Sequence, residues 1–471
     1  GYLRGDYRLN PEHPPLIKTL AAVSGWIFAK PNFSTDTKAW QKEVNGQWEQ
    51  GAIFLYESGN DADRIIFWMR LPLLLLTVLF GWIMFRWIRG RFGSRAALIA
   101  LTFFAFSPTI LTHSRYVTTD MGAALGFFIG IISFIKFLEA PSWRNMLFAG
   151  LLLGTALLLK FSTVLLLPLY GALLLAWVAT RPHYHLHERF RAAGQLLART
   201  LAIGAVAVFL IWGVYTLFTF NYPHERQIRD TEFILTSYPW RPLADFNMAL
   251  VKNPVTRPLG HFVFGALMVN QRSVFGNTQF FLGEISAAGF RSYFPVLYLL
   301  KEPLAFHILT LIALAFALRK IFRSKLILSP SRPGFNRVRA WIADHFAEFT
   351  ALIFIAFYWA VSIASPLNIG IRHVLPTFPF IYLLVARQLS EWLRAHDAVN
   401  PSTWLSWLRN IYELYLKSIP RYLALWGLLF WLAVSVIASY PNFMTYYNEL
   451  AGGERNGYNI AVDSNYDWGQ D

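Results

Sequence analysis

Residues 120–138, DMGAALGFFIGIISFIKFL, decide the fold of this chain. Apart from Asp120 at one end and Lys136 near the other, every side chain in this stretch is apolar or small. A helix needs about 20 such residues to cross the hydrocarbon core of a bilayer. The stretch therefore predicts a membrane-spanning helix that carries an acidic residue where it begins.

Comparable apolar runs recur along the whole chain. We expect ten spans, at 65–88, 96–112, 120–138, 146–159, 162–180, 200–220, 293–318, 347–364, 373–387 and 422–440. Two of them, 146–159 and 373–387, are short for a bilayer, and we expect them to border cavities or to re-enter. A strand barrel is excluded because the runs are continuous rather than alternating. The sequence thus predicts an all-α polytopic membrane protein.

The composition narrows the possible chemistry. Apolar residues make up 55% of the 471 residues and aromatic residues 17%, and the chain has no cysteine. Disulfides, thiolate catalysis and cysteine-ligated metals are therefore excluded. A cysteine-free chain of this kind fits a bacterial envelope protein, so we expect it in the bacterial inner membrane.

The distribution of charge predicts the orientation of the spans. The alternate loops 86–95, 136–145, 181–199, 319–346 and 387–421, with Glu348 beside them, hold 22 Lys or Arg and 7 Asp or Glu. The rest of the chain holds 20 residues of each sign. The whole net charge of +15 lies on one side, which is the positive-inside pattern, so these loops are expected in the cytoplasm. The charge reflects topology and attraction to membrane lipids, and we expect no nucleic-acid partner.

This orientation divides the chain into five parts. We expect a first outer loop with an interfacial helix at 1–64, membrane helices at 65–220, an outer loop or lid at 221–292, membrane helices at 293–440 and an outer tail at 441–471. In the first part, Leu16, Leu20, Val23 and Ile27 recur at helical spacing, which predicts an amphipathic helix on the membrane surface. The tail is expected to lead into a further outer segment, and a span is expected before the first loop.

The segment Asn10-Pro-Glu-His-Pro-Pro-Leu-Ile-Lys18 lies in the predicted first outer loop. Glu12 and His13, held beside a Pro-Pro step, could bind a divalent metal or take part in acid–base chemistry. The structural alternative is a turn that anchors the interfacial helix, with Glu12 near the helix N-terminus. The residues alone leave both readings open.

Several charged residues lie where the predicted spans meet the outer side. Asp120 either caps its helix together with Thr119 or serves a site at the membrane edge. Each of the basic groups could extend its charge to the interface, or bind an anionic head group. Their gathering on the side that disfavours Lys and Arg would be explained by a lipid phosphate or pyrophosphate. They are Arg115, Lys160, Lys301, Arg372 and His373.

With these residues assembled, the chain resembles the lipid-carrier-dependent glycosyltransferases of the GT-C membrane superfamily, in the branch of protein O-mannosyltransferases and aminoarabinose transferases. The segment from Asn10 to Lys18 is similar to the first-loop His-Pro-Pro-Leu motif of that branch. Further similar motifs follow in order: Thr119-Asp120, Gly154 to Lys160 with Pro168, Tyr293-Phe294-Pro295, Lys301-Glu302-Pro303, Gly370 to Pro376, Asp463-Ser464-Asn465 and Asp467 to Asp471.

The resemblance implies a GT-C-type transmembrane helix bundle that transfers a sugar from a polyprenyl phosphate on the outer face. The acceptor would be a protein, a lipid or a glycan. The family's usual catalytic acid precedes the His-Pro-Pro motif, and Asp6 alone does not match it, so we expect this base upstream of Gly1. Glu12 and Asp120 would then assist catalysis, Glu12 sharing a divalent metal with His13 or orienting the acceptor. The five basic or imidazole groups would bind the phosphate.

Two other classes compete with an enzyme. A transporter or flippase of lipid-linked sugars would also place polar groups at the outer rim. It should, however, carry ionisable residues near the membrane midplane and show paired inverted halves, and the spans have mostly uninterrupted apolar middles. A scaffold would give no reason for acids and bases to gather at span ends. The sequence therefore favours the transferase.

Overall fold

The computed structural model describes residues 1–181, 186–323, 334–394, 403–412, 416, 418–462 and 464–466. Within them, seven helices are long and apolar enough to cross a membrane. They are α4 (Ala62–Phe92), α7 (Asp120–Glu139), α9 (Leu166–Thr180) with the preceding 3-10 turn η3 (Phe161–Leu165), α10 (Leu186–Thr219), α15 (Leu304–Arg323), α17 (Phe346–Ala364) and α20 (Ile419–Ile437). The all-α membrane class is therefore confirmed.

Two of the ten expected spans are short, as predicted, and a third is interrupted. The run at 146–159 lies in α8 (Trp143–Leu159), which is shorter than a full crossing. The run at 373–387 is divided between the 3-10 turn η4 (Ile371–Thr377) and α18 (Phe378–Arg394). The run at 293–318 breaks between α14 (Tyr293–Lys301) and α15, because Pro303 holds Glu302 in an extended conformation.

One further span is bent. Helices α5 (Ser94–Ala105) and α6 (Pro108–Ser114) together are apolar enough to cross, but they meet at an angle of 64°. Pro108 lies at the bend, and a proline disfavours helical geometry in the residue before it. The bend leaves Ser107 between the two helices and Thr109 in the first turn of α6.

The chain divides into two compact units. Unit 1 comprises Gly1–Val78, His113–Gly276 and Ser365–Leu367, and unit 2 comprises Leu79–Thr112, Asn277–Ala364 and Asn368–Asp471. Helices α4 and α6 have residues in both. These units group residues by contact, whereas the five-part division above groups them by membrane side, so that division stays a prediction.

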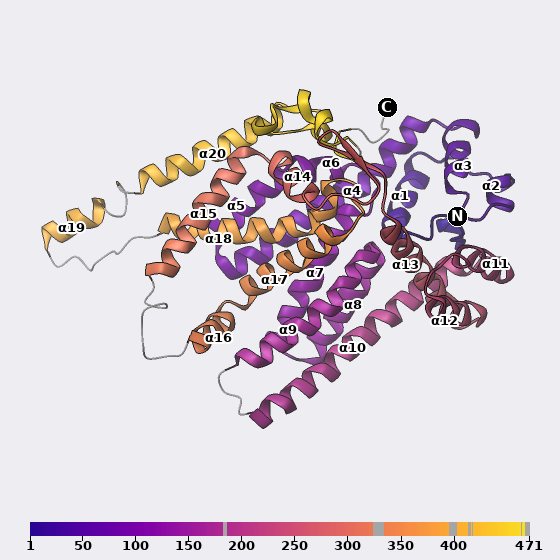
Figure 1. Cartoon of the computed structure of the whole chain (residues 1–471), viewed down its shortest axis with the longest axis horizontal. Coiled ribbons are helices and arrows are strands. Elements are labelled where there is room, and N and C mark those ends of the chain that lie inside the picture. Colours follow the sequence, from indigo (N-terminus) through magenta and orange to yellow (C-terminus); the bar gives the residue numbers. More distant parts are fainter. Residues whose placement is uncertain are drawn as a thin grey trace. The chain divides into compact units, whose positions relative to one another are not determined.

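Close helix packing holds the centre of unit 1 together. Helix α7 packs against α8 and α9, and α8 packs against α10 (Figure 1). Small residues on α8 allow this approach: a Cβ on Gly150 would lie 2.6 Å from Val206 Cβ, and one on Gly154 would lie 3.1 Å from the Ala207 carbonyl oxygen. Glycine at such positions is the usual means by which membrane helices come close.

The N-terminal part of unit 1 is built from short helices. They are η1 (Tyr2–Arg4), α1 (Pro15–Phe28), α2 (Lys38–Gln41), α3 (Gln47–Ala52) and the π-turn η2 (Ile53–Glu57). Helix α1 confirms the helix expected there, with Ile17 and Ala21 buried. Its apolar residues Leu20, Val23 and Trp26 remain exposed, as an interfacial helix requires.

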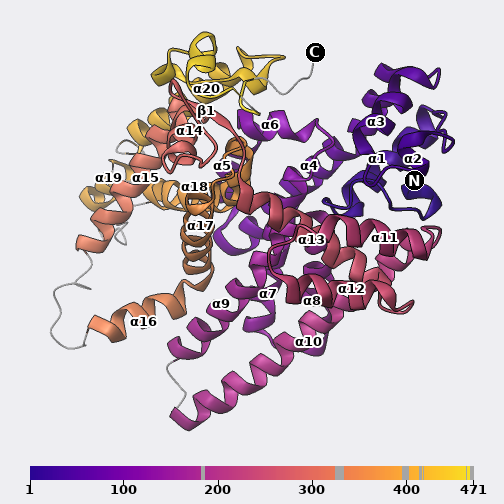
Figure 2. The same ribbon diagram turned by 45° about the vertical axis from the view of Figure 1, so that its right-hand side comes forward.

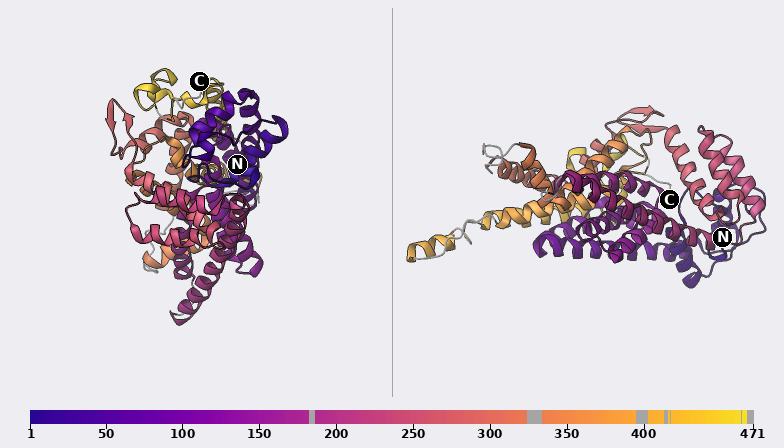
Figure 3. Two further views of the ribbon diagram at one scale, coloured as in Figure 1. Left: turned by 90° about the vertical axis from the view of Figure 1, so that its right-hand side faces the viewer. Right: turned by 90° about the horizontal axis from the view of Figure 1, so that it is seen from below.

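The expected outer loop 221–292 is largely helical. Helices α11 (His224–Leu235), α12 (Arg241–Lys252) and α13 (Arg257–Phe275) pack together in unit 1 (Figure 2). They enclose a small apolar core that includes Leu235, Tyr238 and Phe264. In unit 2 the strands β1 (Gln279–Phe281) and β2 (Glu284–Ser286) form an antiparallel hairpin with Gln279 opposite Ser286 (Figure 3).

Unit 2 is centred on α18, which packs against α5, α15 and α17. Helix α15 also packs against α20, and α14 packs against η4 and α17. The remaining elements are α16 (Gly334–Asp344), α19 (Trp404–Ile411) and the 3-10 turns η6 (Phe443–Thr445), η7 (Glu449–Ala451) and η8 (Glu454–Asn459). The last three turns form most of the described tail, while Asp463 and Asp467–Asp471 lie outside the described residues.

Candidate functional site

The Asn10–Lys18 segment forms a tight turn that opens α1. Pro14 occupies the N-cap position and Pro15 the first helical position, where proline loses no hydrogen bond. The turn folds back on itself, because Lys18 Nζ donates to the Asn10 carbonyl over 2.6 Å and the Tyr7 hydroxyl donates to the His13 carbonyl. Both the anchoring and the functional readings of the segment are compatible with this geometry.

This turn is packed against helices of unit 1. Gly122 of α7 is so close to α1 that an added Cβ would lie 3.1 Å from Ile17 Cδ1. On α13, a Cβ at Gly265 would collide with the Pro11 carbonyl oxygen and with Phe161. The start of α7 and helix α13 therefore fix the position of the Asn10–Lys18 turn, and Phe161 of η3 packs on the same glycine of α13.

His13 lies in a largely apolar and positively charged surrounding. Its pKa is lowered to about 3, mainly by burial and in part by the nearby cations Lys18 and Lys160, while Asp120 acts in the opposite direction. The imidazole is therefore neutral at physiological pH. A neutral imidazole can accept a proton or bind a metal.

Glu12 is half-buried and has a neutral partner. Its Oε1 accepts a hydrogen bond from Gln47 Nε2 over 3.0 Å. Within the described ranges, no three His, Asp or Glu side chains come together as a set of metal ligands. Glu12 and His13 alone do not complete a metal site.

Asp120 and Lys160 form an ion pair. Asp120 lies in the first turn of α7, after Thr119 at the N-cap position, whose side chain makes no capping hydrogen bond. Lys160 follows the last residue of α8, and its Nζ lies 2.6 Å from Asp120 Oδ1. The carboxylate is 4% exposed and the lysine side chain 19%, so the ammonium keeps some access to solvent or ligand.

Arg115 follows α6 in the same unit. It is half-buried, and its guanidinium lies 5.3 Å from the ring centroid of Tyr116. The structure thus brings His13, Asp120 and Lys160 together, and it places Glu12 beside His13 on the same turn.

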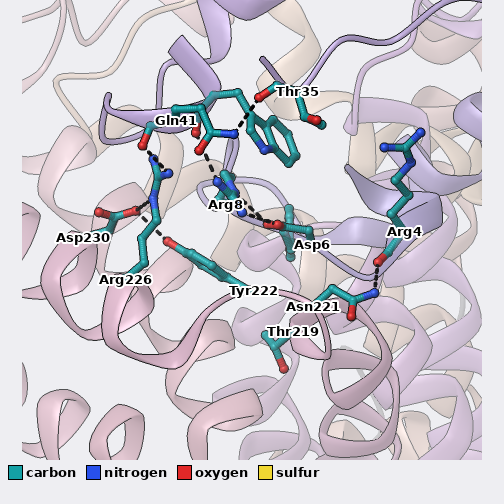
Figure 4. A network of polar contacts seen from close by, with 12 residues as sticks. Arg4, Asp6, Arg8, Thr35, Gln41, Thr219, Asn221, Tyr222, Arg226 and Asp230 are labelled. Atoms are coloured by element: carbon teal, nitrogen blue, oxygen red, sulfur yellow. Dashed lines mark hydrogen bonds and ion pairs between the residues drawn. The ribbon is translucent and has the colours of Figure 1, made fainter. Parts of the chain in front are cut away.

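A polar network attaches the N-terminal segment to the start of α11 (Figure 4). Asn221 Nδ2 donates to the Arg4 carbonyl over 2.6 Å, and Arg226 donates to the Gln41 carbonyl over 2.6 Å. Arg226 also pairs with Asp230 over 3.2 Å. The first two contacts join segments that are about 200 residues apart in the chain, and they hold the first loop in place.

Asp6 has a structural partner in this network. It is buried and pairs with Arg8, whose guanidinium donates to the Trp40 carbonyl over 3.1 Å and lies 4.4 Å from the Trp40 ring centroid. Its carboxylate is therefore engaged in holding the loop, in line with its mismatch to the catalytic acid of the family.

Lys301 belongs to unit 2, where it is 3% exposed at the end of α14. Its Nζ donates to the Met444 and Asn465 carbonyls, each over 2.6 Å, and lies 4.4 Å from the Tyr447 ring centroid. These partners give the ammonium a structural role, because they tie the tail to α14.

Arg372 and His373 lie in the first turn of η4, also in unit 2. Both are half-buried, and Arg372 Nε donates to the Ile369 carbonyl over 3.1 Å. The His373 ring lies 6.3 Å from the ring of Phe294. A guanidinium that keeps partial exposure suits an anion ligand, since its fork can donate two parallel hydrogen bonds to phosphate.

Two polar residues in unit 2 were not among the predicted site residues. Glu302 is buried and accepts hydrogen bonds from Ser107, Thr109 and Tyr382 over 3.0, 2.8 and 3.3 Å. Asn465 is buried beneath Gly370 and Ile371. Both residues lie in motifs quoted in the sequence analysis, and those motifs were the only sequence signal for them. Their hydrogen-bond partners are remote in sequence and could not be inferred from the motifs.

The comparison with protein families gives a direct match. The family of dolichyl-phosphate-mannose-protein mannosyltransferases matches residues 63–215, about a third of the chain, which include Arg115, Asp120 and Lys160. This match confirms the resemblance to the GT-C superfamily and supports a membrane glycosyltransferase. With the seven apolar helices it also supports an integral membrane protein.

The other comparisons add little. No curated protein shows significant similarity to the chain. Among solved structures, the apo crystal structure of ArnT from Cupriavidus metallidurans is similar at 15% identity, over 88% of this chain and 82% of that chain, with a TM-score of 0.26.

Proposed function

We propose that this chain is a membrane glycosyltransferase that takes a sugar from a polyprenyl-phosphate donor and transfers it to an acceptor on the outer face of the bacterial inner membrane. The observation that carries the proposal is the family match over residues 63–215, which includes the Asp120–Lys160 pair. The acceptor is a protein, a lipid or a glycan.

In unit 1, the residues around His13 offer a substrate both a charged group, the Lys160 ammonium, and a neutral one, the His13 imidazole. Lys160 pairs with Asp120 at the head of α7, and the Lys160 ammonium retains partial exposure. A neutral His13 and the nearby Glu12 can orient an acceptor hydroxyl or amine.

In unit 2, Arg372 and His373 are proposed to bind the phosphate of the leaving lipid. The bond from the anomeric carbon to the phosphate oxygen breaks as the acceptor oxygen or nitrogen attacks, and charge develops on the phosphate. A preorganised cation stabilises that charge most in the transition state. Because Lys301 is only 3% exposed and donates to two carbonyls, whereas Arg372 is half-buried, we assign the phosphate contact to Arg372 rather than to Lys301.

Reconstitution of the full-length protein tests this proposal. Vesicles carrying a polyprenyl-phosphate sugar labelled in the sugar should yield free lipid phosphate and labelled acceptor if the protein is a transferase. Movement of intact donor between leaflets without cleavage would instead establish the transporter. Lys160→Ala should lower transfer, whereas Lys136→Ala, an exposed lysine at the other end of α7, should not.

A further inference from the structure

The first backbone N–H groups of the Gly370–Pro376 motif are held by side chains. At the start of a helical turn these groups have no partner within the turn itself. The Gly370 N–H donates to the Tyr293 hydroxyl over 3.0 Å, and the Ile371 N–H donates to Asn465 Oδ1 over 2.9 Å. Two side chains from distant parts of unit 2 thus fix the backbone directly before Arg372.

These two side chains are also linked to each other. Asn465 Nδ2 donates to the Tyr293 hydroxyl over 2.9 Å, and the Asn465 carbonyl accepts from Lys301 Nζ. Asn465 is 1% exposed and Tyr293 is fully buried. A buried network in which each hydrogen bond is made specifies one backbone position, because a displaced donor would be left unsatisfied.

The tail is packed directly on the motif. Gly370 has φ 96°, a conformation that favours glycine, and a Cβ there would lie 2.9 Å from Ser464 Cβ. The motif therefore cannot shift toward the tail, and it is tied to Tyr293 and Asn465 by its own N–H groups.

We propose that Asn465 is a positioning residue for the donor phosphate, acting through the backbone of Gly370 and Ile371 to place Arg372. The inference rests on the proposed function of Arg372. Asn465 itself touches the backbone rather than the substrate. Its loss should weaken donor binding by letting the Arg372 guanidinium move, and it should leave the chemistry that follows binding less affected.

The test measures binding of polyprenyl phosphate and the KM and kcat for the sugar donor in the reconstituted full-length protein. Asn465→Ala should raise the Kd for polyprenyl phosphate and the donor KM about tenfold, roughly the effect of one lost hydrogen bond to a critical group. Asn465→Asp keeps an oxygen acceptor for the Ile371 N–H and should restore most of the affinity.

The decisive readout is the coupling with Arg372. If Asn465 acts through Arg372, the double variant Asn465→Ala/Arg372→Ala should bind no more weakly than Arg372→Ala alone. The matched control is Asn448→Ala. Asn448 is a buried asparagine of the same tail, bonded to the Leu299 and Glu302 carbonyls, and its effect should add to that of Arg372→Ala.

Three outcomes are distinguishable. Wild-type protein that binds no polyprenyl phosphate would refute the proposed function itself. Binding by the wild type with additive losses in Asn465→Ala/Arg372→Ala, or unchanged binding in Asn465→Ala, would overturn the positioning role. Should Asn465→Ala fail to fold, Tyr293→Phe removes the hydroxyl that accepts from the Gly370 N–H and from Asn465 Nδ2, and the coupling of that variant with Arg372 decides the question.

Discussion

Lys160 Nζ lies 2.6 Å from Asp120 Oδ1, and this pair joins the end of α8 to the beginning of α7. The carboxylate is buried, so its charge depends on the lysine for compensation. The pair lies close enough to His13 to influence the pKa of that imidazole. One ion pair thus links two helices to the turn that carries Glu12 and His13.

Breaking the pair should destabilise the protein. Lys160→Met leaves the Asp120 charge buried and unpaired, and should cost about 2 kcal/mol of stability, since the lysine is partly exposed. The double variant Asp120→Asn/Lys160→Met should be more stable than the sum of the two single losses predicts. Thermal unfolding in detergent measures the cycle, and strictly additive losses would contradict a coupled pair.

Removal of the Arg372 guanidinium should lower the transfer rate. Arg372→Ala is expected to reduce kcat/KM on the order of 10²-fold, because it removes a charge that stabilises the developing phosphate. Arg372→Lys should recover only part, since an ammonium lacks the planar fork. Arg455→Ala, an exposed arginine of the same unit, serves as the control. Equal rates for the two alanine variants would refute the role.

Acid should destabilise unit 1 through His261. Burial lowers its pKa to about 3, against an ordinary value of 6.5, and its Nε2 lies 2.9 Å from the Tyr7 carbonyl. The unfolded chain binds the proton more readily than the folded one. The stability that neutral His261 contributes to the folded state is therefore fully present above about pH 6.5. It is lost as the pH falls toward 3, by up to about 1.4 kcal/mol per pH unit.

The measurement compares unfolding of wild type and His261→Gln between pH 7 and 4. The variant should show a shallower fall in stability with acid, whatever its stability at neutral pH. His187→Gln changes an exposed histidine and should follow the wild-type slope. Parallel curves for wild type and His261→Gln would show that another group governs the acid response.

A side chain at Gly265 should displace the Asn10–Lys18 turn. An added Cβ would collide with the Pro11 carbonyl, so Gly265→Ala should lose about 1–3 kcal/mol of stability and part of the transfer activity. Gly171→Ala places the same methyl group on α9 where no atom lies within 4 Å. Its stability in the same unfolding assay should be unchanged or slightly higher.

Much of the helical framework could be predicted from local pattern. The apolar run that begins at Asp120 is α7, and the spacing of Leu16, Leu20 and Val23 is that of α1. Such features depend on residues a few positions apart, because helix periodicity and the length of a span are local properties. The break before Pro303 also had a local signal, because a proline restricts the backbone conformation of the residue before it. The apolar residues on both sides nevertheless led to the prediction of one continuous span.

The partners of the charged groups were decided by tertiary packing. Lys160 and Lys301 were similar in sequence, each a lysine that interrupts an apolar stretch. The fold gives Lys160 a carboxylate 40 residues away, whereas Lys301 meets carbonyls of Met444 and Asn465, more than 140 residues away. Local sequence encodes which segments are helices and that a charge at their ends needs a partner. Which group satisfies that charge depends on the helices that come to lie beside it, and only the folded chain brings those together.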